Sequence, residues 1–215
     1  MRPIRRTIIL GLSMLLMACG GSTEKIENDM NEPNSYEKKN IGSVLALYPS
    51  PLTVIGATVD GKVNWTLVAH VGVMGHDRVM VSMKKDHHSN VGIRQNRMLS
   101  INMVDEAMLP KADLMGCVSG ADVDKSGTFK YTLHNEVPTI DESPLTMVCE
   151  VVDNYQTETF DNFICRIVGT YVAEEALNEQ GKIDYNTLKP VLFEFPTYKY
   201  LRTGDVIGDC KKMHK

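Results

Sequence analysis

Short alternating runs of apolar residues, separated by polar turns, make up most of the chain from residue 52 onward. Residues 52–59 and 62–67 flank Asp60-Gly61, a dipeptide typical of two-residue hairpins, and predict two paired strands. Further strands are predicted at 78–83, 98–104, 129–133, 145–152 and 163–172. This many short strands with few helices favours a mainly β barrel over a doubly wound sheet.

Two short helices are expected between these strands. Residues 105–115 predict a helix interrupted by Pro110, and 119–127 a loop with two glycines. After the strand 78–83, the polar residues 86–90 predict an N-cap region that opens a second helix. Free backbone N–H groups and the positive end of the helix dipole would meet there beside Lys84 and Lys85, which suits a phosphate group. A solvated loop before a capped surface helix is the alternative.

The first 18 residues are typical of a signal peptide, because three arginines precede an apolar run too short to span a bilayer. Their end, Leu16-Met17-Ala18-Cys19, resembles the bacterial lipobox, which implies that Cys19 is acylated and begins the mature chain. An ordinary secretory signal is the alternative. We therefore expect a cell-envelope lipoprotein, on the periplasmic side or in the outer membrane of a bacterium, and glycine rather than aspartate after Cys19 favours the outer membrane.

The remaining chain divides into a tether and one domain. Residues 19–39 are rich in Ser, Asn, Glu and Lys without an apolar period, which predicts a flexible tether behind the lipid. Residues 40–215 are long enough for one domain with a sizeable core. Removing residues 1–18 takes away three arginines and no acids, so the net charge changes from −4 to −7. An acidic chain without a basic surface argues against nucleic-acid binding.

Several segments between Ile41 and Gly208 carry, in one collinear order, a resemblance to a known family. They include GHDRVMVSM, LSINMVDEAMLPKAD, DESPLTMVCEV and KPVLFEFPTYKYLRTGDVIG. Over this range the chain resembles the flavin reductase-like superfamily, and within it the flavoredoxin branch. The resemblance implies an FMN-binding split β-barrel that pairs as a homodimer.

The same resemblance implies a set of cofactor-binding residues. The residues expected beside the isoalloxazine ring and ribityl chain are Asn64, Trp65, Thr66 and Leu67. Those expected at the phosphate are Ser82, Lys84, His87, Ser89 and Asn90, and the far wall or the dimer partner would contribute Asn102, Ser119 and Gly120. A place in the barrel core is the alternative for Trp65, the only tryptophan.

Two cysteines invite a separate hypothesis. Cys149 and Cys165 share strand parity with apolar neighbours, so both should point into the core. They lie symmetrically about Thr157, so in a regular hairpin they would face each other, either as a disulfide or as two buried free thiols. The sequence contains no C-x-x-C, H-E-x-x-H or G-x-S-x-G motif, and so gives no support for a thioredoxin-like, metal or serine-hydrolase site.

Three functions stay open at this point. The first is a flavoprotein that passes electrons from a donor to an acceptor at the cell envelope through bound FMN. The second is an NAD(P)H-dependent flavin reductase, and the third a non-catalytic split-barrel binding lipoprotein. A surface lipoprotein has little access to cytosolic nicotinamide cofactor, which favours the first. The redox partner cannot be named from the sequence.

Overall fold

The computed structural model describes residues 35–214. The predicted signal peptide, the lipidation residue Cys19 and the tether up to residue 34 lie outside the described residues. Residues 35–44 are exposed and form no helix or strand, and the folded unit starts at Leu45. Among the helices of the described part, none is long and apolar enough to cross a membrane.

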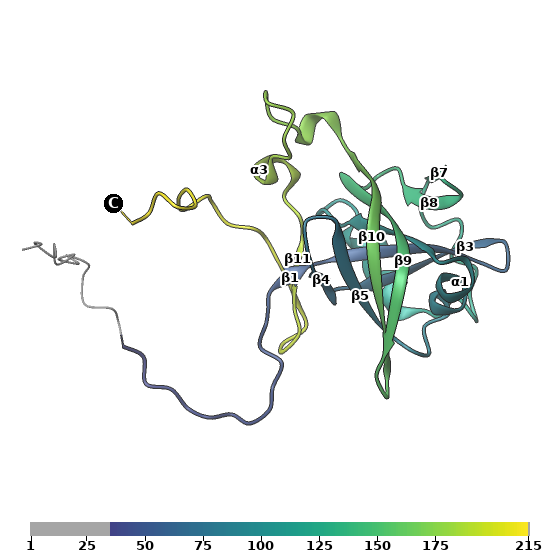
Figure 1. Cartoon of the computed structure of the whole chain (residues 1–215), viewed down its shortest axis with the longest axis horizontal. Helices are drawn as coiled ribbons and strands as arrows, with labels where there is room; N and C mark the ends of the chain where they lie inside the picture. The colour runs from purple at the N-terminus through teal and green to yellow at the C-terminus, as the bar shows by residue number, and fades with distance from the viewer. Residues whose placement is uncertain (1–34, 215) are drawn as a thin grey trace, which may run out of the picture. The chain divides into compact units, whose positions relative to one another are not determined.

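One curled antiparallel sheet of seven strands forms the body of the folded unit (Figure 1). Its spatial order is β3-β2-β6-β9-β10-β5-β4. In chain order these strands are β2 (Thr53–Val59), β3 (Lys62–Val68), β4 (Val71–Val73), β5 (Arg78–Lys84), β6 (Met98–Met103), β9 (Leu145–Gln156) and β10 (Phe160–Val172). The curled sheet confirms the predicted mainly β split-barrel class.

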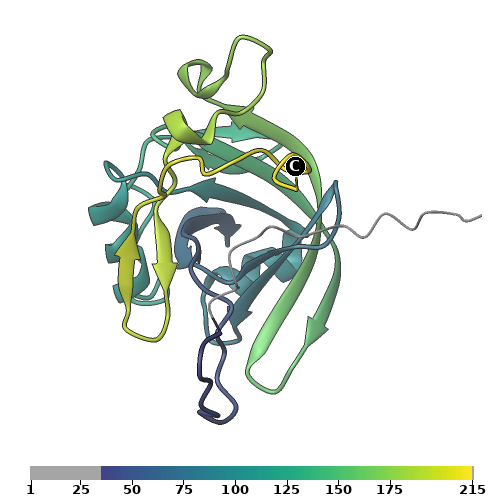
Figure 2. The ribbon, with the colours of Figure 1, turned by 90° about the vertical axis from the view of Figure 1, so that its left-hand side faces the viewer.

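Two smaller sheets and the helices complete the unit. Figure 2 shows the β11–β12 hairpin, in yellow, beside the curled main sheet. The small strands are β1 (Ser50–Pro51), β7 (Tyr131–His134), β8 (Val137–Ile140), β11 (Leu192–Glu194) and β12 (Lys199–Leu201). The helices are α1 (Ser89–Asn96), α2 (Leu109–Cys117), α3 (Tyr185–Leu188) and the 3-10 turn η1 (Glu174–Ala176).

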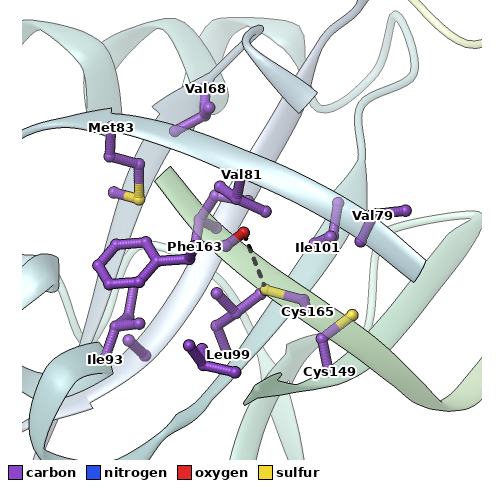
Figure 3. Packing of buried hydrophobic residues seen from close by; sticks show 13 residues of the cluster. Val68, Val79, Val81, Met83, Ile93, Leu99, Ile101, Cys149, Phe163 and Cys165 are labelled. Carbon is purple, nitrogen blue, oxygen red and sulfur yellow. Dashed lines mark hydrogen bonds between the residues drawn. The ribbon is translucent and has the colours of Figure 1, made fainter. Parts of the chain in front are cut away.

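The predicted β2–β3 hairpin is present, and its turn has the backbone that the sequence indicates. Asp60 and Gly61 have φ angles of 49° and 77°, and a two-residue type I′ turn needs positive φ at both positions. Inside the sheet, the apolar residues of alternate strand positions meet α1 in one buried cluster (Figure 3). The core therefore follows the alternation of the sequence.

The structure differs from the sequence prediction at three places. Pro110 lies in the first turn of α2 and begins the helix instead of interrupting it, because proline lacks only an N–H that the first turn does not use. Strand β8 contains Pro138 and was not expected. The 129–133 strand is displaced, since β7 spans Tyr131–His134.

Cys149 and Cys165 both point into the core as predicted, and both are free thiols (Figure 3). They do not face each other. The β9–β10 hairpin changes register between Ile164 and Cys165, so that Cys165 pairs with Val151 and Cys149 with Ile167. The hairpin turns between Gln156 and Asp161, which pair with each other, so its midpoint lies beyond Thr157 and the two cysteines are not equally far from the turn.

Candidate functional site

Three adjoining hollows open beside β3 and the turn that follows β5. The first, which we call the polar hollow, measures about 330 Å³ and reaches from Thr66 to the loop after α2. The second, the aromatic hollow, measures about 390 Å³ and shares Leu67, Lys84 and His87 with the first. The third, about 320 Å³, contains Asn64 and shares Gly120 with the polar hollow. The shared residues make the three hollows neighbours.

Lys125 is the buried cation of the polar hollow, and the sequence alone did not reveal it. Its residue is only 4% exposed, and its Nζ donates to the backbone oxygens of Trp65 at 3.1 Å and Met115 at 3.0 Å. An ammonium carries three N–H donors, so one is left over after these two bonds. Burial lowers the pKa of Lys125. Exposed Lys84 adds a second cation to the same hollow.

His87 lies where the polar and aromatic hollows meet. Burial lowers the pKa of His87, and the charge of Asp86 opposes that change less strongly. Its Nδ1 is buried and has no hydrogen-bond partner among the residues that the structure describes. An orphaned buried polar atom costs about 1–3 kcal/mol, so this atom indicates a polar ligand group or a water at the junction.

The start of α1 differs from the predicted capped helix. Its N-cap residue is His88, which makes no capping hydrogen bond through its side chain. The Ser89 hydroxyl instead bonds to the side chains of Asn64 at 2.6 Å and Thr66 at 2.5 Å, and the residue is fully buried. Ser89 therefore ties α1 to β3 and lines none of the three hollows, while its expected contact with a phosphate stays a prediction.

Three more predicted site residues, Asn90, Asn102 and Trp65, lie in the interior. Asn90 is fully buried, and its side-chain N–H groups point to protein oxygens. The Asn102 amide donates to Val54 O and Ser100 Oγ and accepts from Ile140 N and Thr146 Oγ1, which uses its whole capacity.

The Trp65 indole is also fully buried, and it packs edge-on against Phe129 with ring centroids 5.8 Å apart. Its side chain thus takes the alternative place in the core, because a bulky ring on β3 gains more from packing there than at the surface.

The other predicted residues do meet around the hollows. These are Asn64, Thr66, Leu67, Ser82, Lys84, His87, Ser119 and Gly120. A side chain at position 120 would place its Cβ 2.0 Å from Asn64 Oδ1, so the close approach of the two walls requires glycine there. Between residues 35 and 214 no group of three His, Cys, Asp or Glu side chains is placed to hold a metal ion.

Aromatic side chains from distant parts of the chain line the second hollow. They are His70, Phe160, Phe193, Phe195 and Tyr198. Burial lowers the pKa of His70, and Tyr48 bonds to its Nε2 at 2.6 Å while stacking on Phe195 at 6.0 Å. The only sequence signal for this wall was the aromatic spacing of residues 193–200.

The two joined hollows therefore differ in chemistry along their length. Two lysines and an imidazole suit an anionic group at one end, and a wall of rings suits a flat apolar ligand at the other. A single ligand with a phosphate and a planar ring system would match both ends.

Comparison with known proteins gives concordant matches. A family model described as "Flavin reductase like domain" matches residues 45–202. Flavoredoxin from Methanosarcina acetivorans is 34% identical, with a TM-score of 0.79, over 84% of this chain and 98% of that one. Flavoredoxin of Desulfovibrio vulgaris (Miyazaki F) is 24% identical, with a TM-score of 0.77, over 83% and 100%.

A more distant structure shares the fold alone. It is an FMN-binding protein from Thermus thermophilus with bound 1-cyclohex-2-enone, which is 20% identical with a TM-score of 0.68 over 81% of this chain and 100% of that one. A search of curated proteins found no significant match.

Proposed function

The chain belongs to the flavin reductase-like domain family, and from this we propose that it is a flavoprotein that binds FMN across the polar and aromatic hollows. One observation carries the proposal: Leu67, Lys84 and His87 border both hollows. FMN has a dianionic phosphate at one end and a flat three-ring system at the other, so a single molecule matches both ends of the site.

The residues present fit this ligand. Lys125 keeps one N–H donor for a phosphate oxygen, and Lys84 adds charge at the rim. The orphaned Nδ1 of His87 lies at the junction, where a ribityl hydroxyl can donate to it. Phe193 and Phe195 line the aromatic hollow and offer an apolar surface to the flavin rings. Bound FMN would supply a centre that takes up and releases electrons.

A titration with two flavins tests the proposal. The full chain in detergent should bind FMN much more tightly than riboflavin, because each charge-assisted contact to the phosphate is worth about 1.5–3 kcal/mol. Lys125→Met should weaken the binding of FMN and leave the affinity for riboflavin nearly unchanged. Lys130→Met, an exposed lysine away from the hollows, is the matched control. Equal affinity of the wild type for the two flavins would remove the phosphate site from the polar hollow.

We further propose that FMN stays bound and exchanges electrons with a redox partner. Support comes from the predicted signal peptide, which would keep the domain away from cytosolic nicotinamide cofactor, and from the 34% identity to a flavoredoxin. Dithionite should then reduce the bound flavin fully, while NADH and NADPH should reduce it slowly or not at all. Rapid NADH oxidation with free FMN turning over would favour the flavin reductase alternative.

The cell envelope is the proposed location, with the lipid on Cys19 as the anchor and a homodimer as the assembly. Cys19→Ser should move the protein from the membrane fraction to the soluble fraction. If that variant still sediments with membranes after a high-salt wash and the wild type carries no acyl mass, the anchor is wrong. Light scattering of the soluble variant measures the assembly, and a monomer mass would contradict the dimer.

A further inference from the structure

A buried carboxylate lies behind the turn that joins the two hollows. Asp161, on β10, has no exposed surface. Its Oδ1 accepts hydrogen bonds from Asn154 Nδ2 at 3.1 Å and Gln156 Nε2 at 3.0 Å. Its Oδ2 accepts from Asn90 Nδ2 at 3.0 Å and from a guanidinium nitrogen of Arg94, which balances the charge. Four donors from β9 and α1 thus converge on one carboxylate.

Asn90 connects this carboxylate to the ligand-binding turn. One hydrogen of its Nδ2 points to Asp161, and the other to the backbone oxygen of Lys84 at 2.8 Å. The same Lys84 oxygen accepts from the backbone N–H of His87 at 3.1 Å. The Asn90 amide therefore closes the turn from Lys84 to His87, and both of these residues line the polar and the aromatic hollow.

The orientation of the Asn90 amide is set by its two partners. An ionised carboxylate and a backbone carbonyl only accept hydrogen bonds, so both require the nitrogen end of the amide. Asn90 Oδ1 is consequently left buried, with no hydrogen-bond partner in the described part of the chain. The amide of Asn90 keeps this orientation although its own Oδ1 is left without a donor. The two acceptors, Asp161 and the Lys84 carbonyl, therefore determine the orientation.

Building on the proposed function, we propose that Asp161 is a positioning residue that sets the preference for phosphorylated flavin. Asp161 orients Asn90, and Asn90 holds the Lys84–His87 turn at the place where the phosphate end of FMN meets the polar hollow. Asp161 itself lines none of the three hollows. Its effect on the ligand passes through the turn, so it should act on the phosphate and much less on the ring.

Asp161→Asn tests this inference, because it keeps the shape of the side chain but replaces one acceptor oxygen by an NH2 group. That group faces N–H donors and cannot accept their hydrogen bonds. Titration of the full chain in detergent should show FMN affinity lower by about tenfold or more, the loss expected from one misplaced charge-assisted contact. Riboflavin affinity should fall much less than FMN affinity, since riboflavin shares only the ribityl contact with His87 and lacks the phosphate that Lys84 helps to hold. Far-UV circular dichroism and the emission maximum of Trp65 report whether the variant folds.

Asn90→Ala is the second variant and decides the matter if Asp161→Asn does not fold. It cuts the connection to Lys84 while Asp161 keeps Arg94, Asn154 and Gln156 as partners. It should show the same selective loss of FMN. Glu150→Gln is the control: it removes an exposed carboxylate–arginine pair of the same hairpin and should leave the FMN to riboflavin ratio unchanged.

Two results overturn the inference alone. One is a folded variant that keeps the wild-type affinity for FMN, and the other is an equal fold loss of affinity for FMN and riboflavin, which would indicate a structural role only. A wild-type chain that binds neither flavin, or both equally, would overturn the proposed function and this inference with it. The affinities of the wild type therefore separate the two failures.

Discussion

Gly92→Ala has two opposite effects on stability, a gain in helix propensity and a steric clash of the added Cβ with a neighbouring strand. Gly92 lies inside α1, where replacement of glycine by alanine ordinarily stabilises a helix by about 0.8–1 kcal/mol. In the folded protein, a Cβ at this position would lie 2.1 Å from Thr58 O and 2.8 Å from Thr58 C. The neighbour is strand backbone, which cannot rotate away. We therefore expect destabilisation.

The magnitude follows from how far α1 would have to move. Ordinary contact begins at 3.4 Å, so the helix must shift away from β2 by about 1 Å. Such overpacking costs about 1–3 kcal/mol. The shift would also stretch the bonds of Ser89 to β3 and of Asn90 to Asp161, each worth about 0.5–1.5 kcal/mol. After the helix-propensity gain is subtracted, a net loss of about 2–4 kcal/mol is expected.

Urea unfolding measures this loss directly. Trp65 is the only tryptophan and is fully buried, so its fluorescence reports the folded state, and circular dichroism gives a second probe. The melting temperature should fall by about 5–15 °C. Gly75→Ala is the matched control, because nothing lies within 4 Å of its added Cβ. A Gly92→Ala chain as stable as the wild type would refute the packing argument.

Two further predictions concern titrating groups. Burial lowers the pKa of Lys125 below its ordinary value of 10.5, so between the two values the unfolded chain binds a proton that the folded chain does not. The difference in free energy of unfolding between the wild type and Lys125→Met should therefore rise as the pH approaches 10.5. Urea unfolding at several alkaline pH values measures this difference, and a difference that does not change with pH would contradict the prediction. Burial raises the pKa of Cys149 and Cys165 to about 12, so iodoacetamide should label exposed Cys117 and spare both in the native protein, as mass spectrometry can show.

The residues that line the hollows fall into two groups, those expected from the sequence and those that the sequence did not indicate. Thr66, Leu67, Lys84 and His87 were expected from the resemblance and do line the hollows. Lys125 was missed because a lysine in a loop with glycines ordinarily faces water. Only the close approach of that loop to β3 and α2 supplies the two carbonyl acceptors that make its burial tolerable.

Local rules of the chain determined the strands, the Asp60-Gly61 turn and the inward parity of Cys149 and Cys165. Alternation and turn chemistry act between neighbours in sequence, so these features do not depend on distant residues.

Only the tertiary structure decided which polar residues line the hollows. By sequence, Ser89 and Asn90 are typical helix-capping residues. In the structure α1 packs against β3 and β10, so both residues are buried and bind these strands through hydrogen bonds. His70 and Phe195 become neighbours across more than a hundred residues. Such contacts depend on how the sheet curls and on bulges that shift its register, and no local pattern encodes either.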